Sequence, residues 1–223
     1  MDADFWRSRW ANREIGFHRS DIHWALTEHW NRTFSGTADS EAEKTPQVLV
    51  PLSGKALDLR WLADHSRGIT GIELDERAVR EFFDEWGHEP EIDGPDHLRY
   101  YRAGNIELVC GDFFRWYPDR GYSRFYDRAA LVALPADMRR DYLAHLHACL
   151  APEAEGLLVL FEYDPDAMGG PPFSVPAREV TDSGLFALER LERRSVLEEN
   201  PGLAARGLET LHESVYRMLR LPG

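Results

Sequence analysis

The sequence has few of the features that mark secreted, metal-binding or membrane proteins. Its 223 residues include two cysteines, Cys110 and Cys149, which form no CxxC pair. Disulfide frameworks and zinc sites need paired or clustered cysteines, so we expect two buried, reduced thiols and no metal site. The chain also has neither the apolar run of about 18 residues that spans a membrane nor an N-terminal secretion signal. These absences predict a cytoplasmic protein that does not cross a membrane.

Positive charge is also scarce. There are 26 basic against 39 acidic residues, a formal net charge of −13, and Lys44 and Lys55 are the only lysines. Nucleic acids and anionic membrane surfaces are bound by basic faces, so this balance argues against both as partners. No long apolar pattern indicates a surface for a second subunit. We therefore expect a monomer that acts on a small molecule.

The sequence does contain short apolar strands that alternate with amphipathic helices. Apolar runs rich in β-forming residues predict strands, and apolar positions with a period near 3.6 predict helices. The alternation predicts right-handed βαβ units, and hence an α/β fold with a doubly wound, mostly parallel sheet and helices on both faces. Strands are predicted at 47–52, 68–74, 106–110, 124–127 and 156–163, and helices at 56–64, 76–86 and 137–150.

Three further stretches complete the prediction. The Gly- and Pro-containing stretch 87–96 predicts a surface loop. Alternating apolar and polar residues at 185–191 and 213–219 predict an antiparallel pair at the edge of the sheet. The first residues are rich in aromatic side chains and predict helices. The chain shows no repeat and no linker, so we predict one domain, with N-terminal helices over 1–32 and a core over 47–223.

Polar residues follow the strands where ligands bind in such sheets, beyond the carboxyl ends. Glu73 closes the second strand, 19 positions after the glycine turn at Gly54. An acid there can accept hydrogen bonds from both hydroxyls of an adenosine ribose. Asp112 and Phe113 follow the third strand, where a carboxylate can accept from the amino group of an adenine while the ring packs on the base. Together these residues predict a nucleoside site.

The glycine turns that bind phosphates are missing. The chain contains no GxGxxG, the signature of dinucleotide sites in NAD-linked oxidoreductases, and no GxxxxGK[ST], the signature of a phosphate-binding loop. Residues suited to a nucleoside therefore occur without those suited to a phosphate. This combination favours a nucleoside cofactor that carries no phosphate, of which S-adenosylmethionine is the common example.

Several longer strings make the sequence similar to a known family. The most specific are DRAALVALP and GPPFSV, and they stand in order with VLVPLSGKALDLRWLA, GIELDERAVREFF and GDFF. Over about residues 5–182 the chain resembles the thiopurine S-methyltransferase family. The resemblance implies a class I methyltransferase fold, in which a seven-stranded sheet has an antiparallel last strand and an N-terminal helix covers the site.

The resemblance also implies roles for individual residues. One position departs from the family pattern, because Ser53 stands where the family usually has cysteine in its PLCGK turn. Serine is isosteric with cysteine, so we expect the turn to bind the cofactor. Carried over position by position, the cofactor contacts fall on Trp10, Leu52, Glu73 and Arg128, with Asp112 and Phe113 near the adenine and Phe17 toward the acceptor. A second departure lies near the C-terminus, where Arg206 is the nearest candidate for the arginine that some members of the family present to the substrate.

The chemistry implied by the resemblance is methyl transfer from S-adenosylmethionine to the sulfur of an aromatic or heterocyclic thiol. Such a transfer is an in-line displacement, which needs alignment and the exclusion of water but neither a metal nor a covalent nucleophile. Arg128 could lower the pKa of the thiol through its permanent charge. Asp127 could accept the proton, directly or through water.

Two other functions stay open. A related methyltransferase could share the cofactor site and act on halide, thiocyanate, or selenium and tellurium oxyanions, and the cofactor motifs do not distinguish these acceptors. A non-catalytic domain could keep the same fold and bind S-adenosylmethionine as a sensor. The joint presence of the N-terminal aromatics, Asp127 and Arg128 argues against the second alternative.

Overall fold

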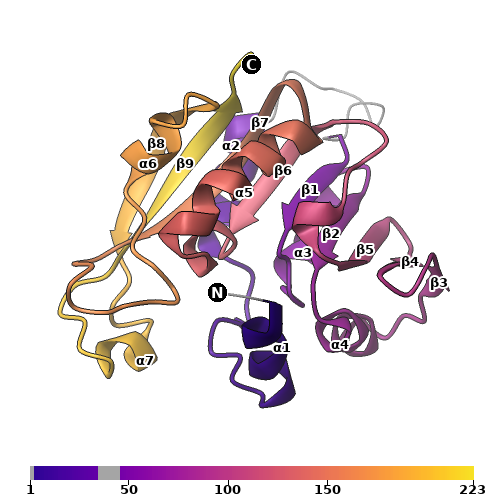
Figure 1. Cartoon of the computed structure of the whole chain (residues 1–223), viewed down its shortest axis with the longest axis horizontal. Helices are drawn as coiled ribbons and strands as arrows, with labels where there is room; N and C mark the ends of the chain where they lie inside the picture. Colours follow the sequence, from indigo (N-terminus) through magenta and orange to yellow (C-terminus); the bar gives the residue numbers. More distant parts are fainter. Residues whose placement is uncertain (1–2, 35–45) are drawn as a thin grey trace. The chain divides into compact units, whose positions relative to one another are not determined.

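The computed structural model of the chain describes residues 3–34 and 46–223 (Figure 1). The chain divides into two compact units, Met1–Arg124 and Phe125–Gly223, which are taken separately below. Within the described residues, no helix combines the length and the apolar character that a membrane crossing requires.

The first unit is built on three parallel strands. They are β1 (Val48–Pro51), β2 (Ile69–Glu73) and β5 (Ile106–Gly111), with β2 hydrogen-bonded between the other two. Every residue of β1 and β2 is buried, which explains why neither shows the alternation of apolar and polar residues that a strand with one exposed face has. The predicted strands at 47–52, 68–74 and 106–110 are confirmed.

A hairpin extends these strands on the outer side of β5. The strands β3 (Glu91–Asp93) and β4 (Leu98–Ala103) pair antiparallel with each other, and β4 pairs antiparallel with β5. The prediction of a surface loop over 87–96 was therefore wrong at Glu91–Asp93, while the residues on either side of this strand are in neither helix nor strand. The reason is that β3 is short and fully exposed, so its one apolar residue, Ile92, gives no alternating pattern, and the backbone at Gly94 (φ 91°) marks the turn that follows.

Two helices of the first unit follow its strands. They are α3 (Asp58–His65) and α4 (Glu76–Trp86), and α4 has the bounds predicted from its apolar period. Asp75 caps the start of α4 by accepting a hydrogen bond from the backbone N–H of Arg77, and Gly87 ends it in the left-handed conformation (φ 73°). The start of α4 is thus fixed directly behind Glu73, the last residue of β2.

The N-terminal part of the first unit is less helical than predicted. It contains α1 (Ala3–Ala11), a π-helical turn at Leu26–Trp30 and α2 (Asn31–Phe34), while residues 12–23 form no helix. Figure 1 shows α1 beside α4. Arg77 of α4 donates to the carbonyl oxygen of Arg7 in α1 at 3.2 Å, which ties the two helices together.

The second unit pairs long strands antiparallel. Its strands run in the order β6 (Tyr122–Arg128), β7 (Leu150–Glu162), β9 (His212–Arg220) and β8 (Phe186–Ser195). The β7–β9 and β8–β9 pairs are antiparallel, which confirms the predicted pair at 185–191 and 213–219. The helices of this unit are α5 (Ala136–Cys149), α6 (Ala177–Thr181) and α7 (Pro201–Ala204).

The strand count differs from the seven that the resemblance implied. The described residues form nine strands, and the two additional ones are the β3–β4 hairpin. The other seven correspond to the five strands predicted between residues 47 and 163 and to the antiparallel pair predicted after them. The additional hairpin lies on the outer side of β5, so it leaves the carboxyl ends of β1 and β2 open to ligands.

Candidate nucleoside site

The turn after β1 is held in an unusual backbone conformation. Leu52 has a φ of 48° and Gly54 a φ of 54°, both in the left-handed region. For a non-glycine residue such as Leu52 this is uncommon, and such residues gather at ligand sites. The backbone N–H of Ser53 donates to the carbonyl oxygen of Ile72 at 2.9 Å, which fixes the turn to β2. The ring of Trp10 lies 3.4 Å from where a Cβ on Gly54 would be, so the turn and the N-terminal helix are in contact.

The carboxylate of Glu73 lies between two backbone donors. The N–H of Gly54 donates to Oε2 at 2.9 Å, and the N–H of Asp75 donates to Oε1 at 2.8 Å. Glu73 is 6% exposed. Burial raises the pKa of Glu73 to about 7, and the negative charge of Asp75 adds to the increase, while the backbone donors act in the opposite direction. Each carboxylate oxygen has two acceptor directions, so the held carboxylate can still accept from a pair of hydroxyls.

Aromatic rings of the N-terminal segment gather beside this turn. Trp10 is buried, and Phe17 is 36% exposed. Their ring centroids lie 5.6 Å apart in an edge-to-face arrangement, and Phe17 makes a second such contact with Trp6 at 5.7 Å. Trp10 therefore connects the glycine turn to a partly exposed aromatic ring. This arrangement is consistent with an N-terminal segment that covers the site.

Asp112 and Phe113 follow β5 at the same edge. Glu73 pairs with Cys110 in the β2–β5 register, so both residues come just beyond the neighbour of Glu73. Asp112 is half-buried, and its Oδ1 accepts from the backbone N–H of Phe114 at 3.0 Å. Phe113 is buried. The carboxyl edge of β1, β2 and β5 thus brings together the first-unit residues that the sequence predicted.

Asp127 and Arg128 end β6, and Asp127 and its partners belong to the second unit. Asp127 is 0% exposed. Its Oδ2 accepts from the hydroxyl of Tyr142 at 2.7 Å, and its Oδ1 accepts from the backbone N–H of Leu131 at 3.2 Å. Burial raises the pKa of Asp127 to about 6, although these donors lower it. Arg128 is half-buried. Asp127 therefore fastens the loop that follows β6 to α5.

Arg206 lies beside the proline-rich loop of the second unit. Its Nη1 donates to the carbonyl oxygen of Pro171 at 2.8 Å. The hydroxyl of Tyr163 donates to the carbonyl oxygen of Pro172 at 2.6 Å, and the N–H of Phe173 donates to the carbonyl oxygen of Val132 at 2.7 Å. The loop that carries Arg206's partner is thereby fixed to the segment that follows β6.

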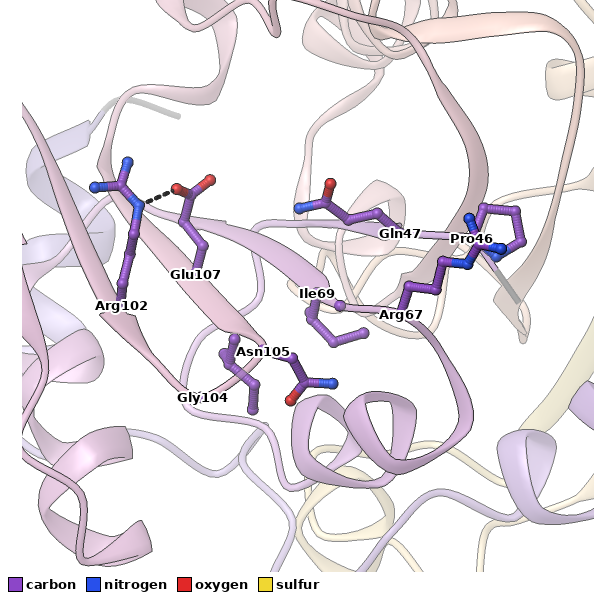
Figure 2. Close-up of a pocket in the computed structure, with 10 residues that line it drawn as sticks. Pro46, Gln47, Arg67, Ile69, Arg102, Gly104, Asn105 and Glu107 are labelled. Carbon is purple, nitrogen blue, oxygen red and sulfur yellow. Dashed lines mark hydrogen bonds and ion pairs between the residues drawn. The ribbon is translucent and has the colours of Figure 1, made fainter. Parts of the chain in front are cut away.

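A cavity of about 500 Å³ lies at the opposite edge of the parallel strands (Figure 2). Its lining residues come from the amino ends of β1, β2 and β5, whereas Glu73 closes the carboxyl end of β2. Its polar side chains bind the protein: Arg102 pairs with Glu107 at 2.6 Å, and Asn105 donates to the carbonyl oxygen of Ala63 at 2.8 Å. This cavity is not the nucleoside site.

Three residues around the predicted sites were missed by the sequence reasoning. Asp75 supplies a donor to Glu73, Lys55 pairs with carboxylates of α4, and Tyr142 donates to Asp127. The capping position of Asp75, directly before a predicted helix, was a usable signal. Nothing in the sequence pairs Tyr142 with Asp127, because the two lie 15 residues apart on different elements.

Comparison with known proteins places these observations in a family. The family model described as thiopurine S-methyltransferase matches residues 1–221. The chain is 45% identical over 224 residues to the thiopurine S-methyltransferase of Pseudomonas paraeruginosa, with 99% of this chain and 100% of that protein covered. It is 46% identical over 227 residues to the thiopurine S-methyltransferase of Azotobacter vinelandii, with the same coverage.

Solved structures agree on the fold. The 1,6-didemethyltoxoflavin-N1-methyltransferase of Burkholderia thailandensis, solved with S-adenosylhomocysteine, superposes with a TM-score of 0.62 at 15% identity, over 99% of this chain and 87% of that one. The N-methyltransferase NodS of Bradyrhizobium japonicum superposes with a TM-score of 0.52 at 14% identity, over 80% of this chain and 79% of that one. The predicted class I methyltransferase fold is confirmed.

Proposed function

This chain belongs to the thiopurine S-methyltransferase family and is an S-adenosylmethionine-dependent methyltransferase, and from that premise we propose that it methylates the sulfur of a small aromatic or heterocyclic thiol. The choice of acceptor is carried by the match to the thiopurine S-methyltransferase family, and the cofactor is supported by the buried carboxylate of Glu73, which the backbone N–H groups of Gly54 and Asp75 hold at the end of β2. Such a carboxylate recognises a ribose that has both hydroxyls free.

The residues of the first unit fit this cofactor. Gly54 leaves no side chain between the turn and Trp10, Glu73 presents its oxygens to the ribose, and Asp112 with Phe113 suits an adenine. We assign Leu52 to the same cradle, because its left-handed backbone shapes the turn. Bound S-adenosylmethionine supplies an activated methyl group on a sulfonium centre.

Trp10 and Phe17 are proposed to cover the reacting groups and exclude water. Their edge-to-face contact leaves the ring of Phe17 partly exposed, so it can pack against an apolar acceptor. Aromatic faces also favour a cation nearby, which suits a sulfonium. The N-terminal aromatic residues are therefore proposed to align the reacting groups and to exclude water, and not to transfer a proton.

Asp127, Arg128 and Arg206 are proposed to serve the acceptor, with Arg128 also among the cofactor contacts. A permanent guanidinium charge at Arg128 favours the thiolate form of the acceptor. The carboxylate of Asp127 is 0% exposed, so we assign it to holding the loop that follows Arg128 rather than to taking the proton itself. The thiol proton then leaves to solvent before methyl transfer.

We further propose that the enzyme works as a monomer in the cytoplasm and does not bind nucleic acid. The net charge of −13 supports the last point. Cys110 and Cys149 are both free thiols, and burial raises the pKa of Cys110 to about 11 and that of Cys149 to about 12. Such thiols are unreactive and suit a reducing compartment.

A turnover assay with methyl-labelled donor tests the acceptor. We expect transfer to an aromatic thiol and to a thiopurine, with iodide and selenite as competing acceptors. Transfer only to oxygen or nitrogen acceptors would overturn the thiol assignment, and exclusive use of iodide or selenite would establish the related alternative. Binding of S-adenosylhomocysteine without turnover of any acceptor would indicate the non-catalytic alternative.

A further inference from the structure

One ion-pair cluster next to the nucleoside site has no role in the function proposed above. Lys55 follows Gly54 in the turn after β1, and it is only 6% exposed. Its Nζ donates to Glu81 Oε2 at 2.8 Å and to Glu85 Oε1 at 2.6 Å. Both carboxylates belong to α4, and their spacing of four residues puts them on one face of the helix. Lys55 therefore ties the turn to α4.

The two elements that Lys55 joins are the two that hold Glu73. Gly54, in the turn, donates to one carboxylate oxygen, and Asp75, at the start of α4, donates to the other. A shift of the turn relative to α4 would change the distance between these two donors. Hydrogen bonds weaken outside a narrow range of about 2.7–3.2 Å, so the orientation of the carboxylate depends on a spacing that Lys55 fixes.

The same cluster reaches the N-terminal segment. Arg13, just after α1, has its Nη2 3.8 Å from Glu81 Oε1. The hydrogen bond from Lys55 lowers the pKa of Glu81, and the positive charges of Lys55 and Arg13 lower it further. Glu81 thus faces the glycine turn through Lys55 and the N-terminal segment through Arg13. These contacts add to the packing of Trp10 on Gly54.

The residue type at this position is informative, because the chain uses arginine for nearly all of its other basic positions. A lysine ammonium is a compact point charge whose three donors can reach two carboxylates on successive helical turns, whereas a guanidinium is larger and holds its donors in a fixed planar fork. Burial lowers the pKa of Lys55, but Glu81 and Glu85 outweigh burial and raise the pKa overall. The ammonium therefore stays charged at neutral pH.

We propose that Lys55 is a positioning residue, which keeps the carboxylate of Glu73 in its ribose-binding geometry and connects it to the N-terminal segment without touching the cofactor. This inference rests on the proposed nucleoside site. An ion pair that only stabilises the fold would change the free energy of unfolding and leave the affinity of folded molecules unchanged. A positioning residue changes the cofactor affinity of fully folded protein, while kcat at saturating cofactor stays close to its original value.

The test compares Lys55→Met with Arg80→Met. Arg80 also forms an ion pair on α4, with Glu76 at 2.7 Å, and its partners in the described structure do not include the turn after β1. Calorimetric titration with S-adenosylhomocysteine is made at a temperature where circular dichroism shows both variants folded. We expect the Kd to rise about tenfold in Lys55→Met, the equivalent of one hydrogen bond, and by no more than about twofold in Arg80→Met. Lys55→Arg, which keeps the charge, is expected to restore part of the affinity.

The outcomes separate this inference from the function on which it rests. Wild-type protein that does not bind S-adenosylhomocysteine overturns the nucleoside site itself. Normal wild-type binding with an unchanged Kd in Lys55→Met, or with an equal loss in Arg80→Met, overturns only the positioning role. If Lys55→Met does not fold, the double variant Glu81→Gln/Glu85→Gln decides, since it leaves the lysine in place: a Kd about fivefold higher supports the proposal and an unchanged Kd refutes it.

Discussion

Replacing Glu73 with alanine tests the centre of the site. The substitution removes both acceptors for the ribose hydroxyls and leaves the N–H groups of Gly54 and Asp75 without their carboxylate partner. Hydrogen bonds to a charged group are worth more than neutral ones, and an unpaired buried donor adds a further loss. We expect S-adenosylhomocysteine binding to weaken by about 1–3 kcal/mol, which corresponds to about a 5- to 150-fold increase in Kd.

The size of the loss depends on pH. The pKa of Glu73 is raised to about 7 because the side chain is buried. Ribose hydroxyls donate to the ionised carboxylate, so binding favours ionisation and releases a proton below pH 7. Wild-type affinity is therefore expected to fall by about tenfold or more between pH 8.5 and pH 5.5. The Glu73→Ala variant has no such carboxyl, so its affinity changes little and the two proteins converge at low pH.

Calorimetry at the two pH values measures both effects, with the folded fraction checked by near-ultraviolet circular dichroism. Glu76→Ala is the control, because Glu76 is a half-buried carboxylate three residues further on, where it pairs with Arg80 and Arg99 and accepts from the hydroxyl of Tyr101. An unchanged Kd for Glu73→Ala at pH 8.5 would refute the placement of the ribose. Wild-type affinity that does not vary with pH would refute the account of the buried carboxylate.

Two further predictions concern how the site is supported. Tyr142→Phe removes a donor to Asp127, so we expect the free energy of unfolding to fall by about 1.5–3 kcal/mol in urea denaturation. Since the pKa of Asp127 is about 6 in the folded protein and lower in the unfolded chain, the loss should be larger at pH 8, where the carboxylate is ionised, than at pH 5; equal losses would contradict this role. Gly71→Ala places a Cβ 2.6 Å from Leu108 Cδ2 and 2.8 Å from Ser53 Oγ, and it should lower stability by about 1–3 kcal/mol. Gly202→Ala, which meets nothing within 4 Å, is the matched control, and an equal Tm for the two variants would show that the crowding is relieved.

The part of the fold that carries the proposed nucleoside site could be predicted from the sequence. The helix α4 has both a clear apolar period and an acidic cap, and β1 and β2 are buried along their whole length and largely apolar. Once these elements are in order, the carboxyl edge of parallel strands is the place where residues from separate turns meet. Glu73 and Gly54 could therefore be paired although they lie 19 residues apart.

Other features depend on contacts that have no local pattern. The hairpin of β3 and β4 was read as a loop because the three residues of β3 are exposed and charged at both ends, and only pairing with β4 makes them a strand. The contacts of Asp127 could not be predicted for a related reason. A carboxylate at the end of a strand looks available for proton transfer, whereas the hydroxyl of Tyr142 and the N–H of Leu131 occupy it in the fold.

The high pKa of Glu73 also connects binding with stability. In the unfolded chain a glutamate ionises near its ordinary pKa of 4.5, whereas in the folded protein it does so near 7. Below about pH 4.5 the carboxyl of Glu73 is protonated in both the folded and the unfolded state, so its raised pKa does not change the free energy of unfolding. As pH rises from 4.5 to 7, the unfolded state loses its proton first, so the fold is destabilised by about 3 kcal/mol at neutral pH.

Cofactor hydroxyls that favour the ionised carboxylate offset this loss, so bound S-adenosylhomocysteine should raise the Tm more at pH 8.5 than at pH 5.5. The backbone donors of Gly54 and Asp75 hold the carboxylate in place while the ligand is absent, and in the positioning role that we propose, Lys55 keeps those two donors at the spacing that the ligand requires.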